Sequence, residues 1–551
     1  MTRSRAVFTP VIAAAALVAV AAGAAVYAGR AGLAFLPGLN DPQPPLAQAD
    51  PVASPTPPAL SERVVLVIVD GLAERASYGL PFIDRLRAVG TDAIATAHAP
   101  SISRPNYVAI VTGVPPLYSG VRNNAYHFPV RLDSIMRRLR AAGRETAYVS
   151  ESSTGFGYLF AEDIEDIDYS PWPGGFEQSA HLALRRGYPL VILLPGWVDD
   201  AGHLYGAASD EYRAAAHRVD RALDEILGHV DLTRTTVIVT ADHGHLDGGG
   251  HGGVEPEVLE VPLVLAGAGI RPGALIREPR LIDIAPTVAA LLGVPAPGHG
   301  FGRTLVEALA VDAGAADALR RADDARIRRN RAVVDAAIRR ARARRDASRT
   351  RRLALVFVAV AAGGLALVAG RRLGAFLVDW RVLAIALPAF PLTFYALVAI
   401  AGHRASLSAL PDEGVGARIV FWFGLAATGV HVAAAWLALR GRVVLRNRLA
   451  AANALAWCGL FVAGVPAAMA WALYGGGPFV DLPGPRLLFL IPAMYISVAC
   501  YAAAAGASLG LELVVFFARV FDPRWALRRA QRRVDRERQR LAGDRPGDAG
   551  D

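Results

Sequence analysis

Three short apolar runs in the first half of the chain each lead to an aspartate. The runs and their aspartates are 63–69 with Asp70, 190–194 with Asp199, and 235–240 with Asp242. Continuous runs rich in Val, Ile and Leu are typical of central strands in a parallel sheet that is covered on both faces. Ligands of such sheets collect at the carboxyl ends of the strands. The pattern therefore predicts an α/β fold with one carboxylate-rich site.

A structural role for each aspartate is the competing interpretation. A single aspartate after a strand is commonly the N-cap of the next helix, and taken alone each of the three would be read so. Three strand ends that each deliver a carboxylate favour a shared site.

Three histidines accompany these aspartates. His203 follows Asp199 by four residues, a spacing that can direct both side chains to one ion on a helical turn. His243 adjoins Asp242, and the glycine after it permits the bend that both need to face one site. His251 lies in a six-residue run otherwise made of glycine, which has no side chain to pack around an imidazole. We therefore interpret all three as metal ligands.

Carboxylate and imidazole donors without thiolate suit Zn²⁺, with Mn²⁺ as the alternative. We expect two divalent metal ions, which together can stabilise the attacking and leaving oxygens of an in-line displacement at phosphorus or sulfur. A metal ion lowers the pKa of a bound hydroxyl, so Ser103 in the segment Ser-Ile-Ser-Arg-Pro-Asn could attack as an alkoxide without a neighbouring base.

These motifs resemble the alkaline phosphatase superfamily. Within it, the resemblance is to the type I phosphodiesterase/nucleotide pyrophosphatase branch and to the catalytic domain of the GPI ethanolamine phosphate transferases, and it covers residues 62–310. The segments that carry it are VIVDG at 67–71, SRPNYVAIVTG at 103–113, the Asp199-to-His203 element, TADHG at 240–244, and His251.

The resemblance implies an alkaline-phosphatase-like sandwich, with a mostly parallel central sheet covered by helices. The implied ligands are Asp199, His203 and His251 for one metal ion and Asp70, Asp242 and His243 for the other, with Ser103 bridging toward the second ion as the nucleophile. Asn124 falls where the phosphodiesterase branch has an asparagine that holds a phosphoryl oxygen. The turn before it begins with Ser119, where that branch has histidine.

Two further observations limit the site. Sulfatases share the fold and most of the ligands, but they need Cys or Ser followed by x-Pro-x-Arg. Here the serine motif is followed by Tyr107, which argues against a sulfatase. His245 and His299 could touch substrate, but loop histidines without a role are commoner, so neither is included in the predicted site.

The rest of the chain predicts membrane attachment. Hydrophobic residues make up 53% of the chain, and the arginines behind its net charge of +9 cluster beside apolar runs, which favours a membrane over nucleic acid as the partner. The expected units are a signal anchor at 1–30, a Pro-rich and poorly ordered linker (31–61), the catalytic domain (62–312), a basic helical stalk (313–352), an α-helical membrane bundle of about five spans (353–520) and a basic tail (521–551).

The distribution of charge predicts the orientation of the chain. Basic loops alternate with the less basic loops at 403–417 and 475–485, which fits six spans with both termini in the cytoplasm and the catalytic domain outside the plasma membrane. The arginine-rich stalk would also lie outside, against this rule, but long domains translocate largely regardless of charge. The only cysteines, Cys458 and Cys500, lie in apolar runs and offer the catalytic region neither a disulfide nor a CxxC metal motif.

The function predicted from the sequence is a membrane-anchored, extracytoplasmic two-metal phosphodiesterase that acts through a phosphoserine intermediate. Its partner would be a phosphate ester, free or lipid-linked; protein partners are not indicated. A phosphoethanolamine- or phosphoglycerol-type transferase that modifies an envelope lipid or glycan is the alternative, because both enzymes share the first half-reaction. A catalytically inactive membrane assembly or transport protein is a third interpretation. It is disfavoured because all seven metal-site positions are present.

Overall fold

The computed structural model describes residues 37–152, 155–372, 380–400, 406–409 and 464–474, together with short pieces between 12 and 30, 422 and 437, and 502 and 535. Its centre is a seven-stranded mixed sheet with the order β2-β7-β6-β1-β5-β3-β4. The strands are β1 (Arg63–Ile68), β2 (Thr91–Thr96), β3 (Thr146–Ser150), β4 (Asp166–Tyr169), β5 (Leu190–Leu194), β6 (Thr235–Thr240) and β7 (Glu260–Gly267).

Most strand pairs in this sheet are parallel. The five strands from β6 to β4 run in one direction, whereas β7 is antiparallel to both of its neighbours, β6 and β2. The three predicted runs form β1, β5 and β6, which are adjacent and buried along nearly their whole length. Burial on both faces explains their continuous apolar sequences.

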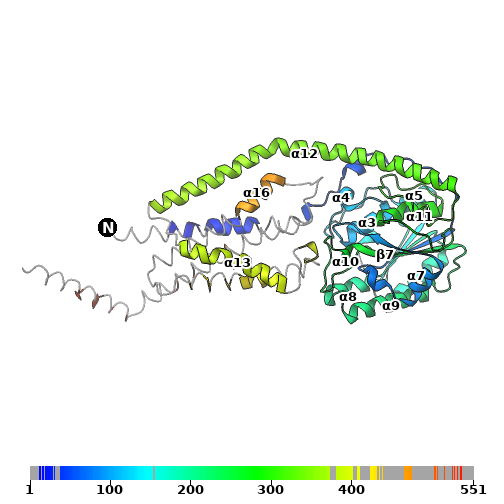
Figure 1. Ribbon diagram of the computed structural model, residues 1–551, viewed down its shortest axis with the longest axis horizontal. Coiled ribbons are helices and arrows are strands. Elements are labelled where there is room, and N and C mark those ends of the chain that lie inside the picture. Colours follow the sequence, from blue (N-terminus) through cyan, green and yellow to red (C-terminus); the bar gives the residue numbers. More distant parts are fainter. Residues whose placement is uncertain are drawn as a thin grey trace, which may run out of the picture.

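Helices cover both faces of the sheet, with α5 and α11 on one side and α8 and α9 on the other (Figure 1). The helices of this domain are η1 (Pro45–Gln48), η2 (Glu74–Ser77), α2 (Pro81–Val89), α3 (Ser103–Thr112), α4 (Pro116–Ser119), α5 (Ile135–Ala141), α6 (Phe156–Leu159), α7 (Gly175–Arg186), α8 (Trp197–Tyr205), α9 (Asp210–Leu227), α10 (Pro256–Leu259), η3 (Leu281–Asp283) and α11 (Ile284–Leu292). The predicted α/β fold with a mostly parallel, helix-covered sheet is confirmed.

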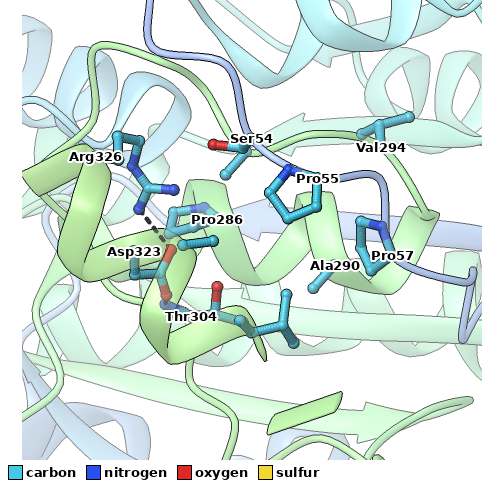
Figure 2. A pocket seen from close by; sticks show the side chains of 12 residues that line it. Ser54, Pro55, Pro57, Pro286, Ala290, Val294, Thr304, Asp323 and Arg326 are labelled. Carbon is cyan, nitrogen blue, oxygen red and sulfur yellow. Dashed lines mark hydrogen bonds and ion pairs between the residues drawn. The ribbon is translucent and has the colours of Figure 1, made fainter. Parts of the chain in front are cut away.

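The segment before β1 is largely extended apart from η1, but it packs on the domain, unlike the poorly ordered linker that we expected. Leu46 is fully buried, and the amide of Leu60 donates a hydrogen bond to the carbonyl of Leu291. Figure 2 shows Pro55 and Pro57 over residues of α11. Proline favours an extended backbone whether or not that backbone is packed, so composition alone does not reveal the packing.

A single long helix, α12 (Ala313–Arg372), contains both the expected stalk and the first expected C-terminal span. Its first turns pack on the catalytic domain, and its last turns are apolar and mostly exposed. Among the described residues, α12 is the one helix long and apolar enough to cross a membrane, by length and composition only.

Other described parts of the C-terminal region are α13 (Trp380–Ile400), η4 (Leu407–Ala409) and α16 (Gly464–Tyr474), and α16 contacts α12. A shorter apolar helix at Ala15–Ala28 lies in the expected signal anchor. Most of the expected membrane bundle beyond residue 400, and the basic tail, lie outside the described residues. The six-span arrangement and its orientation stay predictions.

Candidate metal centre

Three neighbouring strands bring three carboxylates to one edge of the sheet. Asp70 and Asp242 each lie two residues beyond their strands, β1 and β6, and Asp199 lies in the first turn of α8 after β5. Gly71 allows this convergence: its φ is +74°, and a Cβ there would lie 2.8 Å from the Cα of Asp199. Its amide also donates a 3.1 Å hydrogen bond to Asp242 Oδ1.

His243 lies between two of these carboxylates and the predicted nucleophile. Its Nε2 is 3.3 Å from Asp242 Oδ2, 3.6 Å from Asp70 Oδ1 and 3.2 Å from Ser103 Oγ. Its Nδ1 is 3.1 Å from the carbonyl of Gly244, which can only accept. Nδ1 therefore carries the proton in the neutral ring, and Nε2 presents a lone pair to the site.

His251 reaches the same place from the glycine-rich loop. Its Nδ1 donates a 2.8 Å hydrogen bond to the carbonyl of Ser101, which leaves Nε2 as the free lone pair. That Nε2 is 3.3 Å from His203 Nε2 and 3.8 Å from Asp199 Oδ1. The ring of His251 stacks on that of His243, with centroids 3.8 Å apart.

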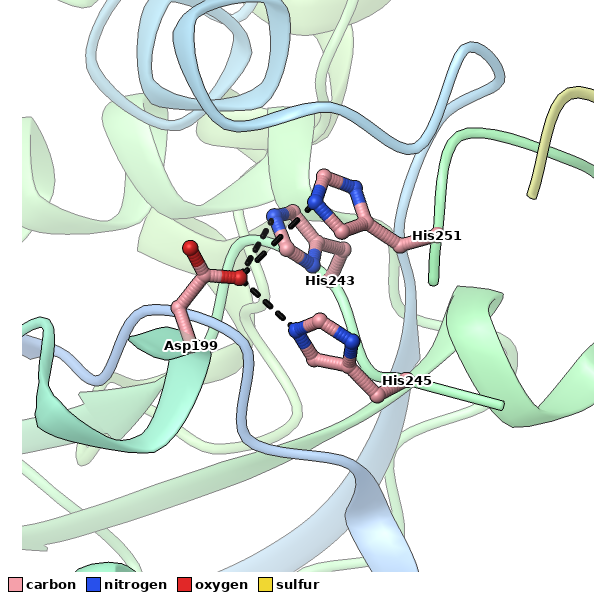
Figure 3. A group of neighbouring side chains, drawn as sticks. All are labelled: Asp199, His243, His245 and His251. Atoms are coloured by element: carbon pink, nitrogen blue, oxygen red, sulfur yellow. Dashed lines mark hydrogen bonds and ion pairs between the residues drawn. The ribbon is translucent and has the colours of Figure 1, made fainter. Parts of the chain in front are cut away.

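His245 is a member of the cluster that the predicted site leaves out. Its Nε2 is 2.7 Å from Asp199 Oδ1, the oxygen on which His243 and His251 also converge (Figure 3). Its spacing of two residues from His243 is a signal in the sequence, because residues two apart lie on the same side of an extended chain, but the spacing does not show whether the chain stays extended through Gly244. His203 also contacts Asp199, at 3.2 Å from Oδ2.

The donors form two groups of metal-ligand type that share His243. In each group the ligand atoms lie within 4.8 Å of one another. The groups are Asp70, Asp242 and His243, and Asp199, His243, His245 and His251. The first has the composition of one predicted ligand set. The second contains Asp199 and His251 of the other predicted ligand set and adds His245. His203, the third member of that predicted set, lies beside Asp199 and His251.

The electrostatics of the cluster favour bound cations. Burial, together with the charges of Asp242 and Asp199, raises the pKa of Asp70 well above its usual value, and burial raises the pKa of Asp242. Burial also opposes ionisation of Asp199, but hydrogen bonds from His203 and His245 outweigh it and hold its pKa well below the usual range. Asp70 Oδ1 and Asp242 Oδ2 are buried and have no hydrogen-bond partner among the described residues. Such carboxylate oxygens fit divalent metal ions.

Tyr107 has a role that the sequence argument missed. Its buried hydroxyl donates a hydrogen bond to Asp70 Oδ2. Burial and the charge of Asp70 raise the pKa of Tyr107, so it stays a neutral donor. The residue that separates the motif from that of sulfatases therefore also orients a carboxylate of the site.

Ser103 is buried and is the first residue of α3. Asn124 lies near it, since its Oδ1 accepts a 3.0 Å hydrogen bond from the amide of Arg104. The guanidinium of Arg104 donates to backbone carbonyls, including that of Tyr126 at 2.7 Å. His299 does not join the cluster: its two ring nitrogens bond the backbone of Asp133 and Ala49.

Comparison with known proteins identifies the relatives of this region. The family model of type I phosphodiesterase / nucleotide pyrophosphatase matches residues 64–151 and 175–259. GPI ethanolamine phosphate transferase 2, catalytic subunit, of Homo sapiens is 27% identical over 49% of this chain and 30% of its own length. GPI ethanolamine phosphate transferase 2 of Schizosaccharomyces pombe is 24% identical over 45% of this chain and 39% of its own length.

Solved structures with a similar arrangement include a protein in the alkaline phosphatase superfamily from Vibrio parahaemolyticus. It has a TM-score of 0.36 and 16% identity, and the match covers 47% of this chain and 72% of that chain. A 2-O GAG sulfatase has a TM-score of 0.38 and 17% identity, over 45% of this chain and 73% of that chain.

The chain spans less than two fifths of the length of these curated relatives. The resemblance predicted from the sequence is nevertheless confirmed for the region that carries the site. Residues 64–151 and 175–259 match the type I phosphodiesterase / nucleotide pyrophosphatase family, and the chain is similar to the GPI ethanolamine phosphate transferases.

Proposed function

We propose that this protein is a membrane-anchored metalloenzyme that cleaves phosphodiesters through a phosphoserine formed on Ser103. The observation that carries the proposal is the position of Ser103 Oγ, 3.2 Å from the histidine shared by both groups of metal-ligand type. A hydroxyl placed there can act as a nucleophile, because the donors around it suit divalent cations.

Asp70, Asp242 and His243 would hold one divalent ion, with Ser103 bridging toward it. Asp199, His203 and His251 would hold the other, with His245 beside Asp199. Zn²⁺ fits these oxygen and imidazole donors, and Mn²⁺ is the alternative. When bound, the two ions would neutralise the carboxylates, lower the pKa of the Ser103 hydroxyl and offset the charge of the phosphoryl group.

The residues of the chain account for the rest of the reaction. Ser103 Oγ forms a bond to phosphorus while the bond to the leaving alcohol breaks, which gives phosphoserine and frees the alcohol. The N-terminus of α3, at which Ser103 lies, presents the partial positive charge of the helix dipole to the phosphoryl oxygens. Asn124 would hold one of those oxygens through its side-chain amide. Attack by water then restores the Ser103 hydroxyl and releases the phosphomonoester.

A transferase is the second candidate, favoured by the similarity to GPI ethanolamine phosphate transferases. In that case the hydroxyl of an envelope lipid or glycan, instead of water, attacks the phosphoserine. Either activity would be exerted outside the plasma membrane, with the chain anchored by its N-terminal segment and by membrane spans that include the apolar part of α12.

The test of the proposed function is the Ser103→Ala variant, assayed on bis(p-nitrophenyl) phosphate. We expect activity to fall by at least about 10³-fold, because the nucleophile is lost while the metal ligands stay in place. Ser103→Thr is the matched control and should stay active, because it keeps a hydroxyl. Activity of Ser103→Ala equal to that of the wild type would refute the phosphoserine mechanism.

Mass spectrometry separates the two candidate activities. Envelope lipids and glycans from cells that lack this protein should accumulate a phosphodiester if the enzyme is a hydrolase. Loss of a phospho-substituent from a lipid or glycan would instead identify a transferase.

A further inference from the structure

A segment of the C-terminal region lies against the loop that carries His251. The segment is η4, which follows α13 by a short connection, and its Ser408 is completely buried. The amide of Gly253 donates a 2.9 Å hydrogen bond to Ser408 Oγ, and that hydroxyl donates a 2.8 Å hydrogen bond to Glu255 Oε2. We call this pair of hydrogen bonds the Ser408 contact.

Ser101 connects the Ser408 contact to His251 of the metal centre. Ser101 Oγ donates a 3.1 Å hydrogen bond to the carbonyl of Gly253 and accepts a 2.9 Å hydrogen bond from the amide of Gly252. The carbonyl of the same Ser101 accepts from His251 Nδ1. The loop is thus held by Ser101 on one side, two residues before the nucleophile, and by Ser408 on the other.

The glycine-rich loop needs such external contacts. Gly249, Gly250 and Gly252 all have positive φ values, between 92° and 109°, and glycine loses more conformational entropy on ordering than any other residue. Gly252 and Gly253 carry no side chain that could pack against the domain. Hydrogen bonds to the backbone of the loop therefore act together with the bond of His251 Nδ1 to Ser101 in fixing where His251 points.

Glu255 is the second residue of the contact and is itself buried. Burial opposes ionisation, but hydrogen bonds from Ser406 and Ser408 hold the pKa of Glu255 below its usual value. An ionised carboxylate is a stronger acceptor than a neutral group, so it fixes the direction of the Ser408 hydroxyl. The lone pair of that hydroxyl then faces the amide of Gly253.

We propose that Ser408 and Glu255 are positioning residues that hold the His251 loop in its metal-binding geometry. The C-terminal region would then complete the metal site as well as anchor the protein. This inference rests on the proposed function, because it requires that His251 binds a metal ion.

The experiment measures Zn²⁺ affinity by competition with a chelator, on the full chain purified in detergent. We expect Ser408→Ala and Glu255→Ala each to weaken affinity by about 10-fold, the lower end of what loss of an outer partner of a metal ligand costs. Glu255→Gln keeps an acceptor for the Ser408 hydroxyl and should stay within about 3-fold of the wild type. Ser348→Ala on α12 and Glu260→Ala at the start of β7 are the matched controls, and should bind as the wild type does.

Hydrogen exchange supplies a readout that does not depend on metal binding. Amides 249–253 should exchange faster in metal-free Ser408→Ala than in the metal-free wild type, because the loop loses a contact. Unchanged affinity and unchanged exchange in both alanine variants would overturn the positioning role. Should Ser408→Ala fail to fold, Glu255→Ala asks the same question from the other partner. A wild-type chain that binds no Zn²⁺ or Mn²⁺ would instead refute the proposed function.

Discussion

His245 is a neutral donor buried beside the proposed metal ligands. Burial lowers its pKa to about 4, so it is uncharged at neutral pH. Its Nε2, 2.7 Å from Asp199 Oδ1, therefore carries the proton when no metal ion displaces it. The carboxylate of Asp199 receives hydrogen bonds from both His203 and His245, which restrict its orientation.

His245→Ala should weaken Zn²⁺ affinity by about 10-fold, because Asp199 loses one of its two imidazole partners. His229→Ala, which removes an exposed histidine just after α9, is the control and should leave affinity unchanged. Zinc titration of the purified full chain provides the measurement. An affinity of His245→Ala equal to that of the wild type would show that His245 neither binds nor orients a ligand.

The positions of single site residues could be predicted from the sequence where the residue comes shortly after a regular strand. Asp70, Asp199 and Asp242 could be placed because parallel strands end at one edge of a sheet. His245 and Tyr107 could not, since their roles depend on how the chain bends after Gly244 and on which side chains surround α3, a helix that is buried on nearly all sides. Neither follows from a periodic pattern.

At the scale of elements, α8 is held by a buried acid. Glu151 directly follows β3, and its Oε1 accepts a 2.6 Å hydrogen bond from the amide of Gly196, the N-cap of α8. Burial raises the pKa of Glu151 to about 7. The helix that carries Asp199 and His203 therefore begins at a group that changes charge near neutral pH.

Glu151→Gln should change how stability depends on pH. Between the usual pKa of 4.5 and the folded-state pKa of about 7, the folded wild type keeps a proton that the unfolded chain has released. The free energy of unfolding contributed by Glu151 is therefore present in full below pH 4.5 and is lost as pH rises through 7.

Glutamine keeps the acceptor and cannot ionise. Relative to the wild type, Glu151→Gln should thus gain about 1–3 kcal/mol of stability between pH 5 and pH 8. Denaturant unfolding of both proteins at each pH measures the difference in their free energies of unfolding. The contributions of other titrating groups are common to both proteins and cancel in this difference. A difference that stays constant over this range would contradict the assignment.

The sequence predicted these elements unevenly. Strands β1, β5 and β6 follow from their continuous apolar runs, but the reversed direction of β7 does not, because the connection and not the strand sets it. The expected boundary at residue 352, between the basic stalk and the first C-terminal span, does not interrupt the helix: α12 runs from Ala313 to Arg372. No glycine or proline lies there to end a helix, so α12 continues through it.

At the scale of the whole molecule, α12 runs from the catalytic domain into an apolar stretch that is long enough to cross a membrane. Sixty helical residues span about 90 Å, enough to cover the catalytic domain and still present an apolar stretch of membrane length (Figure 1). The Ser408 contact joins the same two regions near the metal centre. Two separate links thus hold the catalytic domain to the C-terminal region.

The first turns of α12 are attached to the catalytic domain by buried polar groups. Arg326 is 1% exposed, pairs with Asp323 at 2.8 Å and donates to the carbonyls of Gly300 and Gly302. Asn330, one turn further on, donates to the carbonyls of Gly298 and Gly300. Because these carbonyls belong to the loop after α11, the hydrogen bonds of Arg326 and Asn330 couple the long helix to the catalytic domain.

Arg326→Ala should lower the free energy of unfolding by about 3–5 kcal/mol, since it leaves the Asp323 carboxylate buried without its cation. Arg328→Ala removes an exposed arginine from the same helix and should change stability by less than about 0.5 kcal/mol. Denaturant unfolding of the full chain in detergent, followed by tryptophan fluorescence, measures both. The double variant Asp323→Leu/Arg326→Met should recover only part of the loss, because it avoids the unpaired charge but leaves the amide of Thr304 and the carbonyls of Gly300 and Gly302 without these partners. If Arg326→Ala unfolds at the same denaturant concentration as Arg328→Ala, the contacts of Arg326 do not attach α12 to the catalytic domain.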